Sequence, residues 1–338
     1  MGAPTIEAPT GQRPRRLLRN SVWSAYLLAL AVVTVVFGLP TDRIYQAAWI
    51  VIGIAAFHPD RPWRDHVRTL VDWVPLIAAL VLYDHTRGIA NTLGMPVRVA
   101  ELVSAEQWLF GGTLPTVWLQ ERLIHDGEQP WWTVFTGMVY TSHFVVPWLI
   151  AAIFYVQSRD RWSKYMRRIV LLSYLGLLTY ILLPAAPPWY AARDGVIPAE
   201  IHRGTGFGFH LVSVDVSGDW LAAQGNPVAA LPSLHAAFAL LVTVALWPLA
   251  RNRWWKIPLA LFPAAMAFTL VYGGEHYVVD VLAGWAYVVV TILLARAWER
   301  RRTSRGPEPQ EPQPTPEPEL PQPKREPGPP EPEAEPAQ

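Results

Sequence analysis

The feature that most constrains the fold of this chain is a series of long apolar runs, separated by polar segments that are rich in arginine. A helix needs about 20 apolar residues to cross the hydrocarbon core of a bilayer, and several of the runs approach that length. Hydrophobic residues make up 51% of the sequence and charged residues only 16%. We therefore predict an all-α, polytopic membrane helical bundle rather than a water-soluble domain.

Run length and hydropathy predict about eight transmembrane helices. The predicted spans are 21–39, 44–57, 70–83, 131–156, 169–183, 232–250, 257–272 and 276–295. With the N-terminus in the cytoplasm, the arginine-rich segments after the second, fourth, sixth and eighth spans all face the cytoplasm, as the positive-inside rule requires. The long segments 84–129 and 184–227 then face outward, and the C-terminus is cytoplasmic.

The two ends of the chain are polar. We predict a basic cytoplasmic leader at 1–20 and a disordered cytoplasmic tail at 303–338, because the tail is rich in Pro and Glu and nearly lacks apolar residues.

The chain has no cysteine, which excludes disulfides and cysteine nucleophiles. A net charge of +1 gives no reason to expect a nucleic-acid partner.

Two short histidine motifs stand at the starts of the sixth and eighth predicted spans. The first is a Pro-Ser-Leu-His sequence that ends at His235, and the second runs from His276 to Asp280. Ionisable residues beside membrane spans are costly, so their default interpretation is a functional site. On a helix, a spacing of four residues would let Asp280 orient His276 as a nucleophile or base. The proline suits a first helical turn, whose N–H groups near Ser233 would attract a phosphate.

These motifs resemble two signatures of the type 2 phosphatidic acid phosphatase superfamily. The sequence ending at His235 resembles the second motif, and the His-Tyr-Val-Val-Asp-Val sequence from His276 resembles the third, in the form of the branch that contains inositol phosphorylceramide synthases. The Leu-Pro-Ala-Ala-Pro-Pro-Trp sequence at 183–189 and the segment 83–88 are also similar to that branch. The resemblance implies a six-helix catalytic core, which we place at 69–298, after two additional helices at 21–68.

The resemblance also implies roles for individual residues and a reaction that needs no metal or other cofactor. His276 would form a phosphohistidine, Asp280 would orient it, and His235 would protonate the leaving alkoxide. The arginine that usually precedes the third motif by six residues is replaced here by Leu270. The substrate phosphate must then be bound by other groups.

Arginine binds phosphate through two parallel hydrogen bonds, so the arginines in the outward-facing segments are candidates for this role. The candidates for phosphate binding are Ser233, Arg87, Arg193 and Arg203. The expected lining of the substrate cavity includes His143, Tyr83 and Asp84. For His143, an interhelical hydrogen bond is an equally good interpretation.

We predict a lipid phosphotransferase of the plasma membrane that works at the extracytoplasmic face and moves an inositol-phosphate-like headgroup to an alcohol acceptor. With water as the acceptor, the same residues would form a phosphatase of phosphatidate or a polyprenyl (di)phosphate. Two further classes stay open. His235, His276 and Asp280 could hold a metal ion in a hydrolase, or the intramembrane histidines could relay protons in a transporter.

Overall fold

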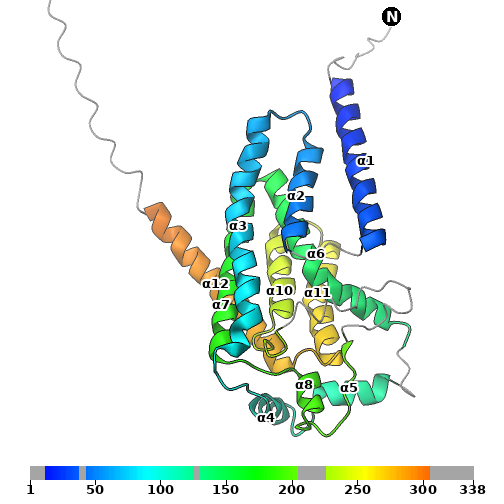
Figure 1. Cartoon of the computed structure of the whole chain (residues 1–338), viewed down its shortest axis with the longest axis vertical. Helices are drawn as coiled ribbons and strands as arrows, with labels where there is room; N and C mark the ends of the chain where they lie inside the picture. The colour runs from blue at the N-terminus through cyan, green and yellow to red at the C-terminus, as the bar shows by residue number, and fades with distance from the viewer. Residues whose placement is uncertain (1–11, 38–42, 125–129, 205–225, 305–338) are drawn as a thin grey trace, which may run out of the picture. The chain divides into compact units, whose positions relative to one another are not determined.

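The computed structural model describes residues 12–37, 43–124, 130–204 and 226–304. Within these ranges the chain consists of helices, turns and short loops with two isolated β-bridges, which confirms the predicted all-α class. Residues up to Arg296 belong to one compact unit, whose helices are labelled in Figure 1. Residues 297–304 continue the last helix into a second unit. Most of the predicted leader and tail lies outside the described residues.

Six of the described helices are long and apolar enough to cross a membrane. They are α1 (Gln12–Phe37), α3 (Trp63–Ile89), α6 (Thr133–Gln157), α7 (Arg159–Leu182), α11 (Arg253–Tyr272) and α12 (Val278–Ser304). Two more apolar helices, α2 (Arg43–Phe57) and α10 (Leu234–Leu246), have 15 and 13 residues. A helix therefore lies within each predicted apolar run, whereas the count of eight spans stays a prediction.

The long helices enclose a core of aromatic and branched side chains. α6 contacts α7, α10 and α11, while α3 contacts α2 and α7. Trp73, Tyr165 and Leu241 are almost fully buried and belong to one apolar cluster. Many large apolar side chains on other helix faces are exposed, as expected of helices whose outer faces meet lipid.

Three short helices lie near one another at one end of this unit in Figure 1. They are α4 (Ala100–Leu109), α5 (Pro115–Leu123) and α8 (Pro188–Arg193). Backbone hydrogen bonds join segments of the same region that are distant in sequence. Arg98 donates its N–H to the carbonyl of Pro184 at 2.8 Å, and Ala185 donates to that of Val228 at 2.7 Å. The loops before α4, α8 and α10 are thus tied to each other.

Of the helix boundaries that differ from the sequence prediction, two affect the site. α3 continues past position 83 to Ile89, so Asp84 and Arg87 lie on its last turns and not in a loop. Positions 83, 84 and 87 share one helix face that is turned inward, whereas positions 85, 88 and 89 are exposed. α12 begins at Val278, so His276 lies in the turn before the helix and not on its face.

Candidate active site

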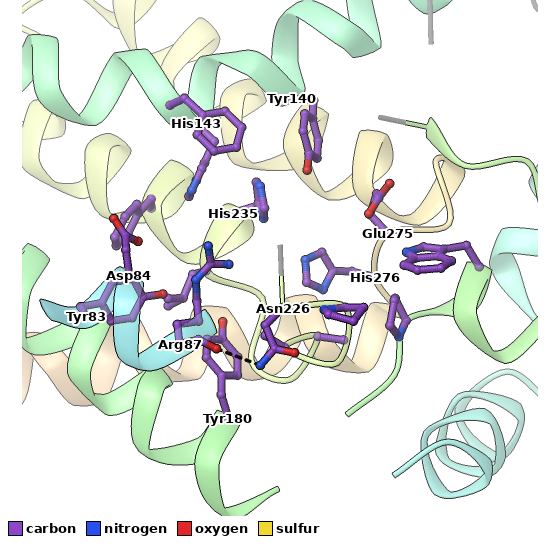
Figure 2. Close-up of a pocket in the computed structure, with 18 of the residues that line it drawn as sticks. Tyr83, Asp84, Arg87, Tyr140, His143, Tyr180, Asn226, His235, Glu275 and His276 are labelled. Atoms are coloured by element: carbon purple, nitrogen blue, oxygen red, sulfur yellow. Dashed lines mark hydrogen bonds between the residues drawn. The ribbon is translucent and has the colours of Figure 1, made fainter. Parts of the chain in front are cut away.

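A cavity of about 400 Å³ lies between α3, α6, α7, α10 and the turn before α12. Figure 2 shows polar side chains from all of these elements around it. The polar residues of its lining are Arg43, Tyr83, Asp84, Arg87, Tyr140, His143, Tyr180, Arg203, Asn226, His235, Glu275 and His276. The fold therefore brings the two histidine motifs to one cavity, together with the three residues that were expected to line it.

His276 and Asp280 form a close pair at the edge of α12. Gly274 makes the turn after α11 with φ of +66°, a conformation that glycine adopts without strain. This turn places Nδ1 of His276 at 3.5 Å from Oδ2 of Asp280. Asp280 is fully buried, and the same oxygen accepts the backbone N–H of Tyr277 at 2.9 Å. A buried carboxylate requires such partners, so Asp280 can fix the ring of His276 and stabilise a positive charge on it.

His235 stands on the first turn of α10 and faces His276. The centroids of the two rings are 5.7 Å apart, which is short enough for both to contact one phosphoryl group. His143 lies 4.0 Å from His235 between ring centroids, and Tyr140 stacks on it at 4.9 Å. Nε2 of His235 is buried and makes no hydrogen bond with any residue in the described ranges. The ring is thus positioned by packing, with a nitrogen available for proton transfer.

The starts of α10 and α12 are joined directly to each other. Ser233 donates its N–H to the carbonyl of Asp280 at 3.0 Å, and its hydroxyl caps α10 by accepting the N–H of Ala236 at 3.3 Å. Gly284 permits this approach, because a Cβ at that position would lie only 2.3 Å from the carbonyl oxygen of Ser233. Ser233 therefore connects the helices and does not line the cavity, and Pro232 precedes the N-cap instead of occupying the first turn.

The three candidate arginines lie in different surroundings. Arg87 and Arg203 line the cavity, whereas Arg193 does not. Nε of Arg203 is 3.0 Å from a carboxylate oxygen of Glu275, which places this charge beside His276. Arg193 is exposed and pairs with Asp194 at 2.9 Å. The geometry therefore favours Arg87 and Arg203 as phosphate-binding groups.

Glu106 on α4 supports the site from outside the cavity and was not singled out by the sequence analysis. Its buried carboxylate accepts the N–H groups of Val278 and Val279, at 2.9 and 3.1 Å, and so caps α12 next to His276. Burial raises the pKa of the Glu106 carboxyl, and these two bonds act in the opposite direction. The only sequence signal for such a role is that Glu106 lies four residues after the apolar Leu102, which places the two on the same face of a helix.

Arg43 is a cavity residue that the sequence analysis also did not single out. Its Nε donates to Oδ2 of Asp84 at 2.8 Å, across 41 residues of sequence.

In the part of the chain that the structure describes, no three His, Cys, Asp or Glu side chains form a group that could hold a metal ion. The metal interpretation of the two histidines therefore has no supporting geometry within that part.

Comparison with protein families settles the class of this chain. Residues 100–294, more than half of the sequence, match the family model described as the PAP2 superfamily. The chain belongs to this superfamily. It is therefore a membrane enzyme of the lipid phosphatase and phosphotransferase class, as the sequence motifs predicted. The matched range contains both histidine motifs and begins after α3.

Curated relatives support the branch that the motifs resemble. The chain is 28% identical to the phosphoinositol dihydroceramide synthase of Bacteroides thetaiotaomicron, over 76% of this chain and 84% of that protein. It is 24% identical to the inositol phosphorylceramide synthase catalytic subunit aur1 of Schizosaccharomyces pombe, over 66% of this chain and 53% of that protein. The inositol phosphorylceramide synthase of Candida albicans is 26% identical, over 42% and 31%. No solved structure matches the chain.

Proposed function

We propose that the protein transfers a phospho-headgroup of the inositol-phosphate type from one lipid to another through a phosphohistidine at His276. One observation carries the proposal: His276 and His235 face one cavity with ring centroids 5.7 Å apart, and Asp280 lies behind His276. A nucleophile, its orienting carboxylate and a general acid require such an arrangement. The relatives are named as synthases, which supports transfer over hydrolysis.

In the first half-reaction, His276 attacks the phosphorus of the donor lipid while the bond from phosphorus to the lipid alkoxide breaks. His235 gives its proton to the leaving oxygen, so that the lipid alcohol departs as a neutral molecule. The phosphoryl group on His276 keeps its headgroup, and Asp280 stabilises the charge on the ring. Arg87 and Arg203 bind the non-bridging oxygens, whose charge grows in the transition state.

In the second half-reaction, the hydroxyl of an acceptor lipid gives its proton to His235 and attacks phosphorus. The bond to His276 breaks, and the enzyme returns to its starting state. If water takes the place of the alcohol, the same groups hydrolyse phosphatidate or a polyprenyl (di)phosphate, which is our alternative proposal. The two reactions differ in the donor and in the acceptor, and both need the same positions of His276 and His235.

The active site is proposed to face the extracytoplasmic side of the plasma membrane. Arginine-rich segments follow the second, fourth, sixth and eighth apolar helices, and such segments remain in the cytoplasm. The cavity lies at the opposite ends of these helices, since His235 stands on the first turn of α10 and His276 lies just before α12. Both chain termini are then cytoplasmic, and the lipid substrate enters from the outer leaflet.

The test uses purified protein in detergent with EDTA, labelled phospholipids, and an added alcohol acceptor or none. We expect the label to move onto the alcohol with the parent protein and not with His276→Ala. Release of free phosphate with the same dependence on His276 identifies the phosphatase instead. Loss of activity in EDTA that an added metal restores supports the metal-dependent alternative. Turnover without a membrane gradient rules out transport as the sole activity.

A further inference from the structure

A pair of opposite charges lies on the wall of the cavity, on helices outside the range that matches the family. Arg43 on α2 and Asp84 on α3 are joined by the 2.8 Å bond from Nε to Oδ2, and both residues line the cavity. Their side chains are 19% and 25% exposed. The guanidinium of Arg43 also lies over the ring of Trp148, 4.5 Å from its centroid. Both groups are thus fixed in place and still in contact with the cavity.

The charge of the cavity lining limits what can bind there. Among the described residues, the lining holds three arginines and two carboxylates, which give one net positive charge, or two when His235 is protonated as the proposed mechanism requires. A phosphodiester carries one negative charge, whereas a phosphomonoester carries about 1.5 to 2 at pH 7. The lining can therefore balance the charge of either ester. The proposed reaction uses a phosphodiester donor, whose headgroup the cavity must also hold.

Asp84 is suited to the headgroup and not to the phosphate. Its carboxylate has no donor to offer a phosphate, whereas Arg87 and Arg203, which also line the cavity, can donate to one. A cationic headgroup would gain little from Asp84, because Arg43 already neutralises the charge. Hydroxyl groups fit best, since the second carboxylate oxygen can accept and the terminal guanidinium nitrogens can donate hydrogen bonds.

We propose that Arg43 and Asp84 form a subsite for the hydroxyl groups of a polyol headgroup, carried by the phosphodiester donor. The inference rests on the proposed function, in which His276 takes up the phosphate with its headgroup attached. In Figure 2, Asp84 and Arg87 come from the same helix, and the head group of Arg87 points into the cavity between Asp84 and His276. Phosphate and polyol would then bind side by side along the wall that α3 provides.

A second ion pair on α3 provides a matched control. Asp72 pairs with Arg159 of α7 and accepts the hydroxyl of Tyr155 at 2.9 Å, but neither member of the pair lines the cavity. If the Arg43–Asp84 pair only connected helices, Asp72→Asn and Asp84→Asn would have similar effects. A polyol subsite predicts an effect on headgroup selectivity that is confined to Asp84→Asn.

The experiment compares the full-length protein with Asp84→Asn, Arg43→Lys and Asp72→Asn in detergent micelles. The donors are phosphatidylinositol and phosphatidylethanolamine, and kcat/KM is measured for release of diacylglycerol from each. The compared quantity is the value for phosphatidylinositol divided by the value for phosphatidylethanolamine. We expect this ratio to fall about tenfold or more in Asp84→Asn, the loss typical of a charged hydrogen bond to a substrate hydroxyl, and to be unchanged in Asp72→Asn. An unchanged ratio in Asp84→Asn overturns the subsite.

Direct binding separates failure of the subsite from failure of the proposed function. Glycerophosphoinositol and glycerophosphoethanolamine are titrated by calorimetry against the same variants, and neither measurement needs turnover. We expect about tenfold tighter binding of the inositol compound by the parent protein and equal binding of both by Asp84→Asn. If the parent protein binds the inositol compound selectively but shows no turnover, this result contradicts the transfer reaction and leaves the subsite standing. Unselective binding by the parent protein, or selective binding that survives in Asp84→Asn, overturns the polyol subsite.

Discussion

A methyl group added at Gly284 should separate the two helices that carry the proposed catalytic residues. The Cβ of an alanine at this position would lie 2.3 Å from the carbonyl oxygen of Ser233 and 3.5 Å from the backbone nitrogen of Ala237. Carbon and oxygen ordinarily approach to about 3.3 Å, so α12 and α10 must move apart by about 1 Å. The bond from Ser233 N–H to Asp280, now 3.0 Å, would lengthen with this movement.

Two magnitudes follow from the displacement of α12. Overpacking of a well-packed contact costs about 1–3 kcal/mol, so Gly284→Ala should unfold at a lower temperature in detergent. A misplacement of about 1 Å between reacting groups can reduce turnover about a hundredfold, because in-line transfer depends on the position of both histidines. We expect kcat to carry most of this loss and KM to change little, since Gly284 does not line the cavity.

The matched control is Gly88→Ala on α3. A Cβ at Gly88 meets no atom within 4 Å, so the same methyl group enters open space. Alanine also favours helix over glycine by about 1 kcal/mol, and we expect stability equal to or above that of the parent protein, with turnover within about twofold. Normal kcat in Gly284→Ala, or equal losses in both variants, would refute the idea that this helix contact positions the histidines.

Four further predictions concern single side chains. Asp280→Asn should lower kcat about a hundredfold or more by releasing the ring of His276, measured as initial rate with a phospholipid donor. His235→Ala should slow a donor with an alkoxide leaving group far more than one with p-nitrophenolate, and equal slowing of both contradicts its role as the acid. Arg87→Ala should lower kcat/KM about tenfold or more, whereas Arg193→Ala should leave it unchanged; equal effects argue against the cavity as the phosphate site. Burial raises the pKa of Glu106, so activity should begin to fall at a higher pH on acidification than an exposed glutamate would give. Glu106→Gln should have lower rates, and its pH–rate profile should lack this fall on the acid side.

The sequence by itself determined the class of the fold and the family. Long apolar runs can only be helices in a membrane, because a spanning segment must satisfy its own backbone hydrogen bonds. Local motifs made His235, His276 and Asp280 the candidate catalytic residues, because a histidine motif and a carboxylate four residues away are visible without the fold. The sequence did not determine where α3 ends, and this boundary decides that Asp84 and Arg87 lie on a helix facing the cavity.

The tertiary structure decided which polar residues share the cavity. Arg203 and Arg193 look equivalent in the sequence, and only the fold places one beside Glu275 and the other on the surface. Arg43 and Glu106 act across 41 and 172 residues of sequence, on Asp84 and Val278. No local pattern encodes contacts of this range, because they arise from the packing of helices against one another. Spacing along the chain can therefore indicate a reaction, whereas the surroundings of the substrate depend on which helix faces meet.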